Sequence, residues 1–127
     1  MSIVQKLRDF YAGAKVSEHG IFDIPGRHEL ELPTGTVKLY YREEWFTDDV
    51  GVRVPKELEV SLTPAGGGPA VPLSMGLPRN GSKFADQGAV AYTFKKLGQA
   101  EVAAGSYILT AEPAVRPDSL PRIMVGS

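Results

Sequence analysis

Apolar and polar residues alternate along most of the chain after residue 20, which is the pattern of β-strands that bury one face. In Arg27–Leu32, for example, His28, Leu30 and Leu32 fall on one face and charged residues fall on the other. The pattern predicts strands at Ile21–Ile24, Arg27–Leu32, Thr36–Glu43, Glu57–Thr63, Ala70–Leu73, Ala89–Lys95, Gln99–Val102, Ser106–Ala111 and Arg122–Val125. Short strands separated by glycine and proline turns predict an all-β fold, an antiparallel β-sandwich of seven to nine strands resembling a jelly roll.

The connection at residues 33–36 has the sequence Pro-Thr-Gly-Thr, which is typical of a tight turn. A four-residue loop here predicts a hairpin in which Leu32 faces Val37 and Leu30 faces Leu39. A loop one residue shorter would place apolar side chains opposite charged ones, so the hydrophobic pattern favours the four-residue register.

The sequence ELPTGTVKL at residues 31–39 is similar to EVAAGSYIL at residues 101–109, about 70 residues later. The similarity predicts two related units of a strand followed by a hairpin, within one two-sheet fold. Because any hairpin with a glycine turn shares part of this pattern, an unrelated origin of the two segments stays open.

The first 13 residues are predicted to form a short amphipathic helix. Ser2 and Gln5 have the spacing of a capping box, and Leu7, Phe10 and Tyr11 share one helical face. A helix this short needs a partner surface, so we expect it to cover an edge or an open end of a sheet. A contact with another molecule, including a homodimer through the helix, is the alternative. The chain is thus predicted to be a single domain over 1–127, with the helix at 1–13 and the sandwich at 20–126.

Composition narrows the function classes. The 127 residues include 14 glycines, 10 prolines and no cysteine, so neither a mainly helical fold nor a disulfide framework is expected. A net charge of −1 gives no general attraction for nucleic acid. The sequence has no apolar run long enough for a membrane span and no apolar stretch of the kind found in secretion signals, so the expected location is the cytoplasm.

Catalytic and metal-binding patterns are not found. The two histidines, His19 and His28, lack the spacing of a zinc site, and His28 is predicted to face inward while Glu29 and Glu31 face outward. There is no Gly-x-Ser-x-Gly motif and no thiol nucleophile. We therefore expect no enzyme activity, no cofactor and no metal. A small enzyme or metal-binding protein that uses His28 with nearby carboxylates is kept as the alternative.

Recognition is the remaining class. The long connections Glu44–Pro55 and Thr63–Gln87, the second with an Asn-Gly turn at residues 80–81, are positions where function often lies. Aromatic residues beside charged ones suit contact with a protein or a sugar ring, although a tryptophan here can also plug the end of the sandwich, and a tyrosine can simply pair across strands. The partner is expected to be a protein or a carbohydrate, and the predicted binding residues are Tyr40, Arg42, Trp45, Phe46 and Arg53.

The segments GRHELELPTGTVKLYYRE and LGQAEVAAGSYILTAE resemble the closing hairpin of small jelly-roll modules. The modules are those of the pre-peptidase C-terminal type and, more distantly, the Golgi-dynamics type. The resemblance covers about 35 residues and implies a role in binding or stability rather than catalysis. The chain departs from these modules in its own N-terminal segment and in lacking the calcium-binding aspartates that some exported sandwiches carry.

Overall fold

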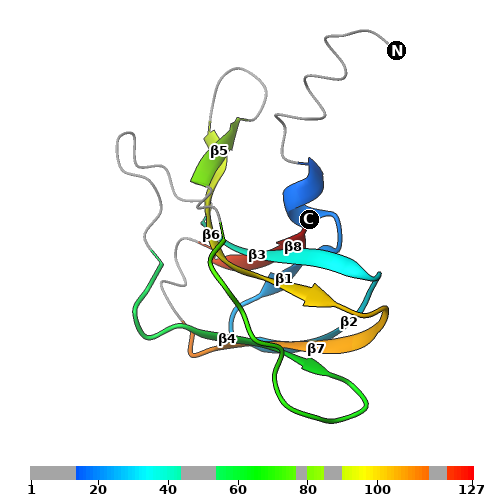
Figure 1. Cartoon of the computed structure of the whole chain (residues 1–127). Coiled ribbons are helices and arrows are strands. Elements are labelled where there is room, and N and C mark those ends of the chain that lie inside the picture. The colour runs from blue at the N-terminus through cyan, green and yellow to red at the C-terminus, as the bar shows by residue number, and fades with distance from the viewer. Residues whose placement is uncertain (1–13, 44–53, 77–79, 85–89, 115–119) are drawn as a thin grey trace, which may run out of the picture.

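A computed structural model of the chain describes residues 14–43, 54–76, 80–84, 90–114 and 120–127. These residues are mainly β and form two antiparallel sheets (Figure 1). The predicted helix at 1–13 lies outside the described residues. The elements are the 3₁₀ turn η1 (Ala14–Ser17) and the strands β1 (Gly20–Asp23), β2 (Gly26–Leu32), β3 (Gly35–Glu43), β4 (Glu59–Pro64), β5 (Asn80–Phe84), β6 (Val90–Val102), β7 (Gly105–Glu112) and β8 (Arg122–Gly126).

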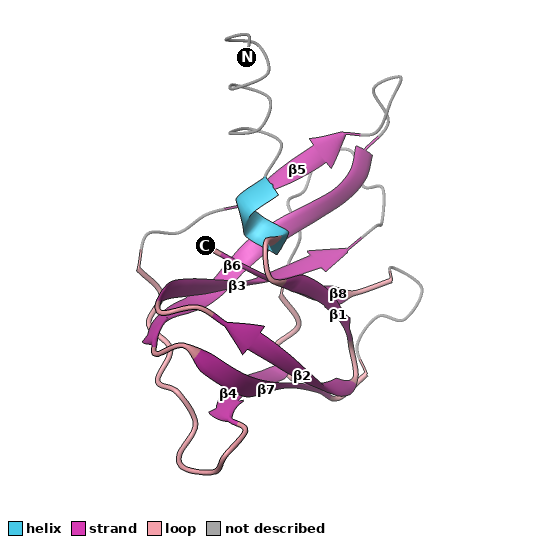
Figure 2. Cartoon of the chain, turned by 90° about the vertical axis from the view of Figure 1, so that its right-hand side faces the viewer, coloured by secondary structure: helices cyan, strands magenta, loops and turns pink. Residues whose placement is uncertain are grey.

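The larger sheet has the strand order β1-β8-β3-β6-β5, and the smaller one has the order β2-β7-β4. Figure 2 shows the three-stranded sheet below the five-stranded one. The main apolar core is built from the facing sides of the two sheets. Its buried members are Ile24, Leu30, Leu32, Val37, Leu39, Tyr41, Leu62, Ala100, Val102, Tyr107, Leu109, Ala111, Ile123 and Val125.

The predicted inward faces are confirmed for β2, β3 and β4, because the apolar residues of each alternation lie in this core or pack against it. The strand bounds differ in three places. Ala70–Leu73 forms no strand, and only Ser74 makes an isolated bridge, to Gln99. The two strands predicted on either side of Gly98 are one continuous β6, and β5 begins where a turn was expected. An Asn-Gly pair therefore does not break this strand.

The predicted hairpin is wrong. β2 and β3 lie in different sheets, so Leu30 is paired with Tyr107 of β7, and Leu39 is paired with Gly98 of β6. The chain crosses between the sheets at Gly35, whose φ of 140° is a conformation that residues with a side chain rarely adopt. Alternation shows which side chains point inward but not which strand is the neighbour, and both arrangements bury the same residues.

A second crossing, at Gly105, repeats the first one. Thr36 donates a hydrogen bond from its hydroxyl to the Glu101 carboxylate, and Ser106 donates the same bond to the Glu31 carboxylate. A shift of 70 residues turns Glu31 into Glu101 and Thr36 into Ser106, so the two bonds are equivalent. The repeat in the sequence therefore corresponds to a structural repeat around a local two-fold relation.

The relation extends to the strand that follows each unit. β4 pairs with β7 as β8 pairs with β3, with Val60 opposite Ala111 and Ile123 opposite Tyr41. Each unit thus has its middle strand in the sheet that contains the outer strands of the other unit. The two units are intertwined.

Candidate binding surfaces

Tyr40 lies on the outer face of the five-stranded sheet, as predicted, but it is not exposed. Its exposed fraction is 0%, and its ring meets that of Phe94 edge to face, with the centroids 5.6 Å apart. Val16 of η1 and Met124 of β8 complete this second, smaller core. The prediction that Tyr40 presents a free aromatic ring to a partner is therefore corrected, because the chain before β1 supplies an apolar side chain to this face.

The other predicted binding residues are not brought together with an exposed aromatic. Arg42 is half-buried and lies on β3 opposite Arg122 of β8. Trp45, Phe46 and Arg53 lie outside the described residues. Of the predicted set, the structure places Tyr40 and Arg42 on one face of one strand, and it buries the first.

His28 points inward, as predicted, at the end of the core. Its ring centroid lies 5.2 Å from that of Phe22, and its Nε2 is 3.0 Å from the carbonyl oxygen of Asp23, which can only accept a hydrogen bond. Glu29 and Glu31 are exposed on the opposite face of β2. In the part of the chain that the structure describes, no three histidine, aspartate or glutamate side chains gather as metal ligands would.

Two charged side chains are buried in the five-stranded sheet. Glu43 is 7% exposed and accepts a hydrogen bond from the Tyr41 hydroxyl at 2.9 Å. Lys96 is 3% exposed and donates to the side-chain oxygen of Gln99. The alternation of β3 already gives the inward position of Glu43, but the burial of Lys96 depends on the bulge that places it opposite Tyr40. Both groups have partners within the fold, as buried charges require.

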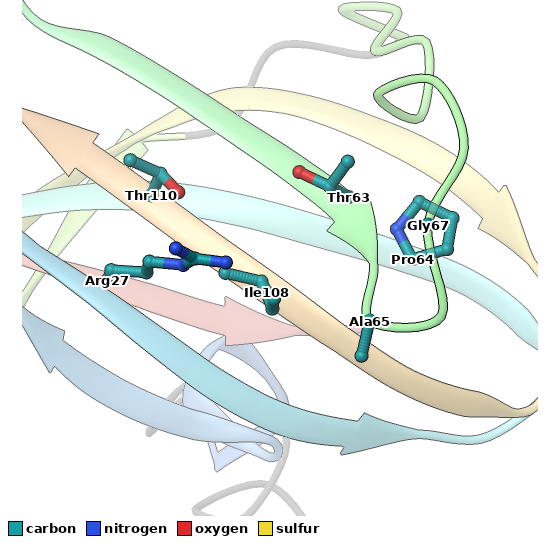
Figure 3. Close-up of a pocket in the computed structure, with 7 residues that line it drawn as sticks. All are labelled: Arg27, Thr63, Pro64, Ala65, Gly67, Ile108 and Thr110. Atoms are coloured by element: carbon teal, nitrogen blue, oxygen red, sulfur yellow. The ribbon is translucent and has the colours of Figure 1, made fainter.

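A groove of about 440 Å³ lies on the outer face of the three-stranded sheet (Figure 3). It is formed where β4 ends and the chain enters the glycine-rich turn at residues 66–68. β2, β7, β4 and that turn contribute the lining residues, which are Arg27, Thr63, Pro64, Ala65, Gly67, Ile108 and Thr110.

Strand pairing positions the groove residues. Arg27 is paired with Thr110, and Thr63 is paired with Ile108, so a guanidinium and two hydroxyls surround one aliphatic side chain. The wall beyond β4 is a turn in which the Gly67 N–H donates to the Pro64 carbonyl at 3.1 Å. Gly67 has a φ of 104°, and a side chain added there would meet no atom within 4 Å, so this wall is open to solvent.

Charge around the groove is uneven. Arg27 is the one charged residue among those that line it. The outward positions of the three strands also carry four exposed glutamates, namely Glu29, Glu31, Glu59 and Glu112. A ligand that fits this surface therefore needs its negative group close to Arg27 and away from the glutamates.

Sequence reasoning did not identify this groove. Alternation correctly places Arg27 and Thr63 on outward faces, but only the pairing of β2 with β7 brings Arg27 beside Thr110. The one clue in the sequence is the glycine run at residues 66–68, within a long connection that was expected to be functional.

Comparison of the chain with protein-family models, with curated proteins and with solved structures gives no match. Among the described residues, no helix has the length and apolar character needed to cross a membrane.

Proposed function

We propose that the protein is a non-enzymatic binding module whose groove holds a carboxylate that sits next to a small apolar group, on a protein or a carbohydrate partner. The observation that carries this proposal is the lining of the groove, in which Arg27 is the one charged residue and Ile108 lies between two threonine hydroxyls. A guanidinium binds a carboxylate through two parallel hydrogen bonds, and hydroxyls can bond to either a sugar or a peptide group.

The fold proposed for this module is a β-sandwich like a jelly roll, with seven to nine strands and an N-terminal helix. The apolar core between the two sheets and the eight strands of the described residues support it. The resemblance to pre-peptidase C-terminal and Golgi-dynamics modules points to the same fold and to a role in binding. Trp45, Phe46 and Arg53 are proposed to extend the contact with the partner, and the N-terminal helix is proposed as a route to a homo-oligomer.

The test is an NMR titration of the ¹⁵N-labelled protein with two carboxylate probes, glucuronate and N-acetyl-isoleucyl-aspartate amide. Glucose and the corresponding asparagine peptide serve as neutral controls. We expect amide shifts at Thr63, Ile108 and Thr110 with at least one of the acidic probes. Arg27→Gln should weaken that binding about tenfold, because it removes a charge-assisted hydrogen bond.

Lys56→Gln is the matched control, since Lys56 is an exposed cation that does not line the groove. This variant should bind the acidic probe as the unaltered protein does. Equal losses in both variants would mean that net charge alone drives binding. Amide shifts confined to residues outside the groove would contradict the proposal.

A further inference from the structure

β4 and β8 hold equivalent places in the two intertwined units, but their outer edges are covered differently. β8 is covered along its length by β1, from Gly20 opposite Val125 to Asp23 opposite Arg122. β4 is an edge strand of its sheet in the described part of the chain. The place beside β4 that matches the one β1 takes beside β8 has no described strand in it.

The first hydrogen bond is the same on both edges. The His19 N–H donates to the Val125 carbonyl at 2.8 Å, and the Val71 N–H donates to the Leu62 carbonyl at 2.7 Å. A shift of 63 residues turns Leu62 into Val125, as it turns Val60 into Ile123. β1 then continues along β8. Beside β4, the next residue is a proline without an N–H, and the chain leaves to form the bridge from Ser74 to Gln99.

The uncovered edge has unused backbone groups. Because the Leu62 carbonyl points away from β7, the N–H and carbonyl of Val60, two residues earlier on the same strand, point away from β7 as well. No described residue makes a backbone bond to them. The Val60 side chain is half-buried against the main core, so an added strand can bury an apolar residue there.

Charge at this edge is opposite to charge at the edge of β8. Asp23 of β1 forms an ion pair with Arg122 of β8, with Arg122 Nε 2.8 Å from Asp23 Oδ1. The residue of β4 at the place of Arg122 is Glu59, which is paired with Glu112 of β7. A strand beside β4 therefore needs a cation where β1 has an aspartate.

We propose that the edge of β4 binds an extended segment of a partner protein by adding it as a fourth strand to the three-stranded sheet. The segment has an apolar residue at the position that Phe22 has in β1, facing the core. It has a lysine or arginine at the position of Asp23, facing Glu59. The inference does not depend on the groove, because the hydrogen bonds are made by the backbone of the opposite edge of β4.

The test uses peptides of residues 17–25 of this chain, with the natural sequence or with Asp23→Lys, added to the ¹⁵N-labelled protein. The lysine peptide should shift the amides of Glu59 to Leu62, and it should bind about three- to fivefold more tightly than the natural peptide. In Glu59→Lys the order of the two peptides should reverse. In Glu29→Lys, which alters an exposed glutamate on β2, the order should stay as in the unaltered protein.

A second variant tests the edge itself. Val60→Pro removes an N–H that faces away from β7, so it keeps the ladder bonds to β7 while blocking an added strand. Peptide binding should be lost in Val60→Pro and retained in Val60→Ala, which loses the same side-chain contact but keeps the N–H. Circular dichroism establishes that both variants are folded.

Three results would overturn the proposal. The first is failure of the lysine peptide to bind at millimolar concentration. The second is amide shifts at Ile123 to Val125, which would show that the peptide displaces β1. The third is a dimer in sedimentation that Val60→Pro converts to a monomer, because the occupant of the edge would then be a second copy of the chain.

Discussion

Tyr40→Ala is expected to lower the free energy of unfolding by about 3–5 kcal/mol, as truncation of a buried aromatic side chain generally does. The ring is fully buried between Val16, Phe94 and Met124, and its removal leaves a cavity beneath η1. Chemical denaturation followed by circular dichroism measures the change. The same substitution would have little effect on stability if Tyr40 were an exposed binding residue.

Ile21→Ala is the matched control for this site. Ile21 is 47% exposed and lies on β1 opposite Met124, at the border of the same small core. Its truncation should cost less than about 1 kcal/mol, since little additional surface becomes exposed. Equal losses in both variants, or a loss below 1 kcal/mol for Tyr40→Ala, would contradict the described packing of the outer face.

Leu109→Ala is expected to lower the free energy of unfolding by about 2–5 kcal/mol. Leu109 is fully buried on the central strand of the three-stranded sheet, between His28 of β2 and Leu62 of β4. Its side chain belongs to the core that both sheets share. The loss of its methyl groups should therefore weaken the contact between the sheets, which a lower midpoint of urea unfolding would measure.

The neighbouring residue Ile108 provides the comparison, because its side chain points to the opposite face and lines the groove. Ile108→Ala should cost less than about 1 kcal/mol, and it should alter probe binding rather than stability. A larger loss of stability for Ile108→Ala than for Leu109→Ala would mean that the two faces of β7 have been assigned in reverse.

Alternation in the sequence was sufficient to predict the buried face of each main strand. It correctly places Leu30, Leu39 and Leu62 inside, because burial depends on one face of a strand and that face repeats every second residue. It does not identify the neighbouring strand. Pairing of β2 with β7 joins residues that are 73 to 85 apart in sequence, from Leu32 with Gly105 to Gly26 with Ala111.

The repeated segment held information about pairing that the hairpin interpretation did not use. Glu31 and Glu101 occupy equivalent positions, as do Thr36 and Ser106, but each glutamate bonds to the hydroxyl of the other unit. A repeat in sequence is compatible with two separate hairpins and with two intertwined units. Only the glycine conformations at the crossings and the contacts between units distinguish them.

The predicted binding residues illustrate a different limit. The outer position of Tyr40 follows from alternation, but its burial depends on Val16, which lies 24 residues earlier and shows no sequence pattern that assigns it to this face. The groove has the same dependence on long-range contacts, since Arg27, Thr63 and Thr110 come from three strands that the sequence does not order.

The central claim is that the chain crosses between the sheets at Gly35 and Gly105, so that β2 pairs with β7 and β3 with β6. Cross-strand nuclear Overhauser effects in a labelled sample test it most directly. We expect contacts between the backbones of Leu30 and Tyr107 and between those of Leu39 and Gly98. Backbone contacts between Leu30 and Leu39, as in a hairpin, would contradict it.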